Sequence, residues 1–314
     1  MKNNRFFQPA LVAATLSPFI AEMISGSTPL RLWLNPMVLM LSLVLYGCGI
    51  ILIHDLTVKW KKGWPTIFAL AGAYMLIEEG FALKTLFDPD KNTLGRLWGV
   101  NWHWLFGMYM VHLVFSIATP ILLTQAIFSK QKGAPWIRPR VLPVLATLYV
   151  GTALTFTFLW RFQMVSPGQY AGLAAVVVLV LVLARNLPAS FSLRHGGVPA
   201  SFLKFWFTGL IGAALIMALD ILLPLKLNWL LSSGIVLSIL GLLVLYVMQQ
   251  SGNGAWQPAA QFALATGITS IWFLAYPLQV ARGNSLVIFF QLALIAFFVR
   301  VWPSVKANET TASI

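Results

Sequence analysis

Residues 34–54 read LNPMVLMLSLVLYGCGIILIH, and this stretch contains no Asp, Glu, Lys or Arg. The hydrocarbon core of a bilayer is ~30 Å thick, and roughly 20 apolar residues in a helix cross it. A surface helix of a soluble protein would carry charged residues on its water-facing side. The stretch therefore predicts a transmembrane helix.

Similar apolar runs, separated by turn-forming and charged residues, recur along all 314 residues. They predict an all-α, polytopic transmembrane bundle of about ten spans, forming one integral membrane domain over residues 1–314. The predicted spans are 7–25, 34–54, 64–87, 102–128, 139–161, 169–186, 202–224, 228–249, 256–280 and 284–303. Ten helices of this length with short connections leave no room for a soluble domain.

The composition agrees with a membrane protein and excludes a nucleic-acid-binding one. Only 9% of the residues are charged and 59% are hydrophobic, whereas soluble domains carry about 25% charged residues. The net charge is +13. The Lys and Arg residues are scattered between the apolar runs, which is typical of residues that orient membrane spans and contact the lipid bilayer. If alternate connections lie on opposite sides of the membrane, fourteen of the 21 Lys and Arg lie on the same side as the N-terminus and seven on the opposite side. This bias predicts that both termini are cytoplasmic.

The placement of the eight acidic residues gives the strongest hint of a site. Glu22, Glu78, Glu79 and Asp220 fall inside predicted spans, where a charge costs ~2.5–3.5 kcal/mol and is retained for a structural or functional role. Two adjacent carboxylates repel each other, so at least one is expected to carry a proton. Neighbours on an α-helix point ~100° apart, so we expect that Glu78 and Glu79 do not face the same partner. Glu78 shares a polar stripe with Tyr74 and Thr85.

Two histidines lie in the predicted span 102–128. His112 shares one helix face with Ser116, and His103, nine residues earlier, lies on the opposite face, where we expect an interfacial residue. At ~1.5 Å per residue, His112 and Glu78 reach similar depths, and Glu22 and Asp220 lie toward the same side of the bilayer. These residues are therefore candidates for one cluster, although depth alone does not fix lateral position.

A second pair of polar residues, His54 and Asp55, ends the predicted span 34–54. We expect them to stabilise a helix terminus or to pair with Lys59.

Two segments carry a resemblance to a known family. IEEGFALKTLF (77–87) followed by GMYMVHLVFS (107–116) resembles the CPBP family, the CAAX-protease-like intramembrane proteins, in its paired glutamates and a histidine 34 residues after Glu78. Leu83 stands where that family has an arginine, and Met108 where it has an aromatic residue. The same region, with GRLWGVNW (95–102), is also similar to uncharacterised bacterial multi-pass membrane proteins, which implies the bacterial cytoplasmic membrane as the location.

Three functions stay open on this sequence. The first is an ion-coupled transporter or permease for a small solute. Its predicted substrate- or ion-binding residues are Glu22, Tyr74, Glu78, Glu79, His112, Ser116 and Asp220. The second, implied by the CPBP resemblance, is an intramembrane metal-dependent hydrolase with Glu78, Glu79 and His112 as catalytic residues. The third is a non-catalytic membrane subunit or sensor.

A catalytic zinc ion normally takes three protein ligands, so the hydrolase also requires Glu22, His103 or Asp220. The chain has no nucleotide-binding loop and no HExxH motif. The metal, the cofactor, the substrate and any protein partner stay open.

Overall fold

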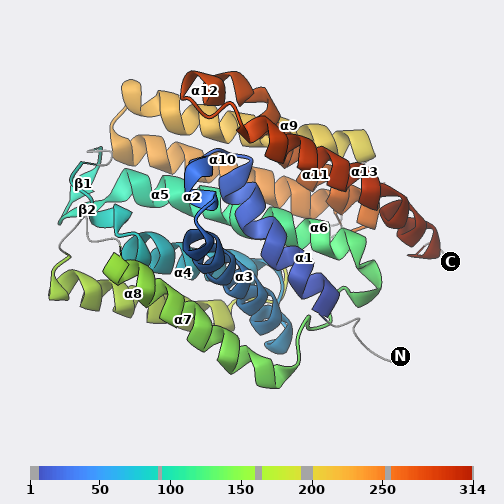
Figure 1. The fold of residues 1–314 in the computed structure, drawn as a ribbon, viewed down its shortest axis with the longest axis horizontal. Helices are drawn as coiled ribbons and strands as arrows, with labels where there is room; N and C mark the ends of the chain where they lie inside the picture. The colour runs from blue at the N-terminus through green and yellow to red at the C-terminus, as the bar shows by residue number, and fades with distance from the viewer. Residues whose placement is uncertain (1–6, 91–93, 160–164, 192–200, 252–255, 313–314) are drawn as a thin grey trace.

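The structure is a computed structural model that describes residues 7–90, 94–159, 165–191, 201–251 and 256–312 (Figure 1). The first half of the chain contains α1 (Phe7–Pro18), η1 (Phe19–Met23), α2 (Leu30–Trp33), α3 (Pro36–Lys59), α4 (Trp64–Met75), η2 (Leu76–Ala82), η3 (Thr85–Phe87), β1 (Arg96–Leu97), β2 (Val100–Asn101), α5 (Trp102–Val111), η4 (His112–Ala118), α6 (Thr119–Ile127) and η5 (Ser129–Gln131). The second half contains η6 (Pro139–Val141), α7 (Leu142–Leu159), α8 (Pro167–Asn186), α9 (Phe202–Leu222), η7 (Leu223–Leu225), α10 (Trp229–Gln250), α11 (Pro258–Leu274), α12 (Tyr276–Ala281) and α13 (Val287–Ala312).

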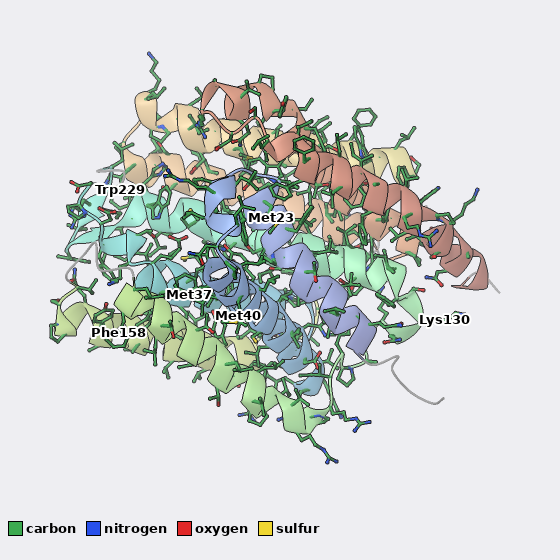
Figure 2. All side chains as sticks on the ribbon, in the orientation of Figure 1. Met23, Met37, Met40, Lys130, Phe158 and Trp229 are labelled. Atoms are coloured by element: carbon green, nitrogen blue, oxygen red, sulfur yellow. The ribbon has the colours of Figure 1, made fainter. Side chains whose placement is uncertain are left out.

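The all-α prediction is confirmed, and helical segments of the described chain overlap the ranges of the predicted spans. Within the described residues, seven helices are long and apolar enough to cross a membrane. The remaining predicted spans correspond to the shorter segments α1–η1, α4–η2 and α11. Large apolar side chains such as Met40 and Phe158 are exposed on the sides of the bundle, where lipid would cover them (Figure 2). The chain is therefore a multi-pass integral membrane protein, and the number of ten spans stays a prediction.

The helices form two groups joined by a central layer. In one group α3 packs against α7 and α4 against α8, and in the other α11 packs against α9 and α13. Between them lie α1 and the continuous helix α5–η4–α6, since α1 contacts both α3 and α6, and α6 contacts α11 (Figure 1). Residues on this central layer therefore face both groups.

The bundle has two distinct ends, visible at the left and right of Figure 1. We call the end with β1 and β2 the hairpin end, and the end where α1 begins and α13 finishes the termini end. Most of the predicted cytoplasmic Lys and Arg within the described part of the chain lie at helix boundaries of the termini end: Lys59, Lys61, Lys62, Lys130, Lys132, Arg138, Arg140, Arg185 and Lys204. Lys2, Arg5, Lys91, Arg161 and Arg194 lie outside the described residues. The cytoplasmic location of the termini stays a prediction.

A small β-hairpin covers the hairpin end. Arg96 pairs with Asn101 and Leu97 with Val100. Trp98 and Gly99 between them both have positive φ, as a two-residue hairpin turn of the favoured hand requires. The buried Asn101 side chain donates to the carbonyl oxygens of Thr85 and Asp88. The hairpin is thereby fixed to the segment that follows η2.

At the termini end, Asp55 anchors a connection between helices. Its carboxylate accepts hydrogen bonds from the backbone N–H groups of Trp136 (2.9 Å) and Ile137 (3.0 Å) and lies 2.8 Å from His54 Nδ1. The His54 ring stacks on Trp136 with centroids 3.6 Å apart. Asp55 therefore holds the segment between α6 and α7, and the predicted pairing with Lys59 is replaced by these contacts.

Glycines set a close helix crossing between α9 and α11. A Cβ atom built on Gly267 would lie 2.1 Å from the carbonyl oxygen of Trp206, and one on Gly209 would lie 2.4 Å from that of Leu264. Small residues allow such backbone contact between membrane helices. Gly209 and Gly267 thus mark close packing of α9 on α11.

We expect Gly267→Ala to destabilise the folded protein by about 1–3 kcal/mol, because the new methyl group meets backbone that cannot move aside. Thermal unfolding of the detergent-solubilised protein measures this loss. Gly241→Ala is the matched control, since nothing lies within 4 Å of its Cβ position. Equal unfolding temperatures for the two variants would contradict the packing account.

Candidate functional site

The three π-helical segments of the described chain carry most of the residues predicted to form a site. Glu22 lies in η1, Glu78 and Glu79 lie in η2, and His112 begins η4. π-Helical turns are rare and occur frequently at functional sites. In this bundle they bring acidic residues and a histidine to the central layer.

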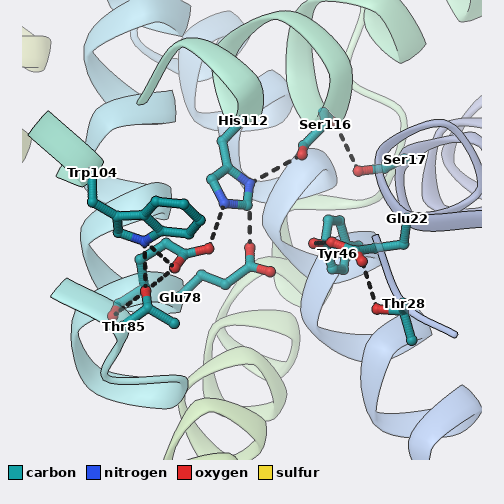
Figure 3. A network of polar contacts seen from close by, with 10 residues as sticks. Ser17, Glu22, Thr28, Tyr46, Glu78, Thr85, Trp104, His112 and Ser116 are labelled. Carbon is teal, nitrogen blue, oxygen red and sulfur yellow. Dashed lines mark hydrogen bonds and ion pairs between the residues drawn. The ribbon is translucent and has the colours of Figure 1, made fainter. Parts of the chain in front are cut away.

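His112 lies between the two glutamates (Figure 3). Its Nε2 is 3.2 Å from Glu79 Oε1, and its Nδ1 is 3.6 Å from Glu78 Oε2. All three side chains are buried, with 2–4% of each residue exposed. The expectation that Glu78 and Glu79 cannot face the same partner is therefore wrong. A π turn is wider than an α turn, and an imidazole presents nitrogens on two sides, so both carboxylates reach one ring.

A proline explains how the His112 segment is held. Pro120 has no N–H, so the carbonyl oxygen of Ser116, four residues earlier, has no donor at that position of the helix. The Ser17 hydroxyl of α1 donates to this oxygen at 2.6 Å. The Ser116 hydroxyl in turn lies 3.1 Å from His112 Nδ1. Ser116 thus contacts the histidine, as the sequence predicts, and also joins η4 to α1.

On one side of the centre, Glu79 connects to the hairpin end. Thr85 donates to Glu79 Oε2, and Trp104 Nε1 lies 3.1 Å from the Thr85 hydroxyl and 3.4 Å from the same carboxylate oxygen (Figure 3). Thr85 was expected on the stripe of Glu78. The π turn and the left-handed conformation of Lys84 (φ 59°) shift it to Glu79 instead.

On the other side, Glu22 is linked to the centre through tyrosines. The Tyr46 hydroxyl donates to Glu22 Oε1 and the Thr28 hydroxyl to Glu22 Oε2, both at 2.6 Å. The Tyr46 ring centroid lies 6.4 Å from that of His112, and the Tyr74 centroid 5.5 Å. Glu22, Tyr46, Tyr74 and the His112 centre therefore form one polar region inside the bundle.

This region approaches a cavity between the segment that follows η1 and the connection that joins α12 to α13. The cavity measures about 340 Å³, and Thr28, Arg31 and Asn284 are among its lining residues. Because Thr28 bonds to Glu22, a short chain of side chains leads from the cavity to the centre. Each member of that chain is a hydroxyl, a carboxyl or an imidazole group, all of which exchange protons.

Asp220 does not join this group. It lies on α9 with its Oδ1 4.0 Å from Nε2 of His103, whose Nδ1 is 3.0 Å from the Ser233 hydroxyl. His103 is buried against α9 and α10, with 4% of the residue exposed, and its interfacial depth stays a prediction. The depth of Asp220 was inferred from the sequence, but the packing of α9 against α11 places it in the other helix group.

Within the described residues, no group of three or more His, Cys, Asp or Glu side chains is arranged to hold a metal ion. The three residues named as a possible third ligand of the hydrolase have other contacts. Glu22 is bonded to Tyr46 and Thr28, and His103 and Asp220 lie together elsewhere.

Four residues of this region were missed by sequence reasoning: Ser17, Thr28, Tyr46 and Trp104. Hydroxyl and indole groups are common in apolar helices, so their presence alone gives no signal. The freed carbonyl four residues before Pro120 was a readable hint that some donor must approach Ser116.

Comparisons with known proteins agree with the membrane assignment. No curated protein and no solved structure matches the chain. A family model described as "Uncharacterized membrane protein family" matches residues 11–305, which is nearly the whole chain. The matching model is not described as that of the CPBP family, and the resemblance to that family stays unconfirmed. The chain therefore belongs to the membrane protein family that this model describes, as the sequence predicted.

Proposed function

We propose that this protein carries a small solute or an ion across the cell membrane, with Glu78, Glu79 and His112 as the centre that couples the movement to protons or cations. In this proposal ten segments cross the membrane and both termini are cytoplasmic. The hairpin end and the cavity near Thr28 then both face outward.

The observation that supports the proposal is the position of one histidine between two carboxylates in the buried interior. A buried charge requires a partner, so the centre favours states of zero net charge. Two such states exist without a bound cation. In one, the imidazole is neutral and both carboxyls are protonated; in the other, an imidazolium faces one carboxylate and one carboxylic acid. Loss of one proton from either state leaves the centre with a net negative charge, which a bound cation must balance.

The neighbouring residues have supporting roles in this proposal. Tyr46, Glu22 and Thr28 pass protons or the ion between the cavity and the centre, through the hydrogen bonds that join them. Tyr74 and Ser116 orient the His112 ring from two sides. Asp220 lies apart from the coupling centre.

The test is solute-driven proton movement in proteoliposomes with a trapped pH-sensitive dye. Panels of amino acids, sugars, organic cations and monovalent metal ions are applied to the wild-type protein. We expect at least one class to change the internal pH, and we expect Glu78→Gln combined with Glu79→Gln to abolish that change. Asp90→Asn is the matched control, because it makes the same acid-to-amide change at an exposed position outside the helices.

Two outcomes contradict the proposal. Proton movement that survives the double substitution would remove these glutamates from the coupling. If no solute class changes the internal pH of liposomes whose protein is folded by its unfolding temperature, proton coupling at this centre is contradicted.

A further inference from the structure

A second cavity lies between the two helix groups, away from the glutamates. It measures about 140 Å³ and is lined by α5, η4, α9, α10 and α11, with Trp64, Phe68 and Trp256 toward the termini end. Its described lining is apolar except for Thr208, the two indole groups and Asp220, the one charged residue among them. Glu78, Glu79 and His112 do not line it. The cavity is therefore a site distinct from the proposed coupling centre.

The Asp220 carboxylate has open acceptor positions at this cavity. Its nearest cation-forming neighbour, His103 Nε2, is 4.0 Å away, beyond hydrogen-bond distance, and no described residue donates a hydrogen bond to it. Gly107 lies next to the carboxylate, since a Cβ atom built on Gly107 would be 3.2 Å from Asp220 Oδ2. A carboxylate at the edge of an apolar space, inside a membrane helix, is costly unless a partner supplies donors or positive charge.

We propose that this cavity binds an organic cation with a small apolar body and one ammonium group. The ammonium would contact Asp220, and the body would lie among Met110, Ile216 and Leu243. The size agrees, because a cavity of about 150 Å³ lined by apolar side chains holds benzene. Aromatic side chains at the far end add surface that packs against a ring.

Charge decides against the other apolar occupants available in a membrane. A hydrocarbon chain would fill the space but donate no hydrogen bond to Asp220, which would keep only the 4.0 Å contact with His103. The headgroup of an anionic phospholipid would face the carboxylate with like charge, which is unfavourable in low dielectric. The binding proposal needs only a site that holds the cation, so it stands whether or not the protein transports anything.

The experiment measures saturable binding of radiolabelled benzylammonium to the full chain in phosphatidylcholine nanodiscs. Benzyl alcohol is the uncharged counterpart of nearly the same shape, used as competitor. We expect benzylammonium to bind more tightly than benzyl alcohol. Asp220→Asn should weaken benzylammonium binding by about tenfold or more, as removal of a charge-assisted contact does. The same variant should leave benzyl alcohol binding unchanged.

A second variant keeps the proposal testable if Asp220→Asn folds poorly. Ala213→Phe fills the cavity but keeps the carboxylate, so it should remove binding of both compounds. Asp90→Asn should change neither, because Asp90 is exposed on a distant connection. Equal affinity of the wild type for the two compounds, unchanged binding in Asp220→Asn, or no saturable binding of benzylammonium would each overturn the proposal.

Discussion

His112→Gln should destabilise the folded protein by about 3–5 kcal/mol, the usual cost of removing one partner from a buried charged group. The wild-type ring contacts Glu78 and Glu79 at once, and each of these residues is at most 4% exposed. Glutamine cannot take up a positive charge, so the two carboxyl groups would face each other with no cation between them. Thermal and denaturant unfolding of the detergent-solubilised protein measure the loss.

The matched variant removes the charges together. Replacing Glu78, Glu79 and His112 by Gln in one protein leaves polar side chains of similar size and no buried charge. Substitution of a whole buried charged group is often close to neutral. We therefore expect the triple variant to be clearly more stable than His112→Gln alone. If the triple variant is the less stable of the two, the three residues do not form one electrostatic unit.

Asp55→Ala should cost about 3 kcal/mol or more, and its effect should be concentrated at the termini end. The substitution leaves the N–H groups of Trp136 and Ile137 without an acceptor in a place where both residues are buried. Each hydrogen bond to a charged acceptor contributes about 1.5–3 kcal/mol. The His54 ring also loses the partner that keeps it stacked on Trp136.

Limited proteolysis of the connection 128–138 measures this local effect, together with the overall unfolding temperature. Asp90→Ala serves as control, because it removes an exposed carboxylate with no buried donors. Unchanged cleavage of the connection in Asp55→Ala would show that Asp55 does not anchor it.

The helical segments could be predicted because membrane composition leaves few alternatives. Residues 34–54 predict a span that the structure extends to α3, Pro36–Lys59. The extension includes Asp55, whose burial depends on the segment around Trp136 and not on its own sequence. The hairpin was not predicted, although Trp98 and Gly99 occupy its two turn positions.

The site could be predicted in part. The scarcity of acidic residues pointed to Glu78, Glu79 and His112, because a charge in such an apolar chain needs a reason. Their mutual contact depends on π turns, for which the sequence offers no reliable pattern. Ser17 and Ser116 are 99 positions apart, so their bond follows from the packing of α1 on η4.

Asp220 shows the limit of depth as a guide. The depth of a residue in the membrane follows from its position along the helix. The direction of its side chain and the residues that it contacts depend on how the helices pack. The Gly209 and Gly267 contacts hold α9 against α11 and turn Asp220 toward Gly107 and His103. Depth alone therefore could not separate the second cavity from the coupling centre.

The most direct test of the central claim is infrared spectroscopy of the protein in lipid at neutral pH, because protonated carboxyl groups absorb apart from carboxylates. Both neutral states of the Glu78–His112–Glu79 centre contain at least one carboxylic acid. We predict a protonated-carboxyl band that disappears in the Glu78→Gln, Glu79→Gln double variant and persists in Asp90→Asn. A spectrum in which the double substitution removes no such band would contradict the account.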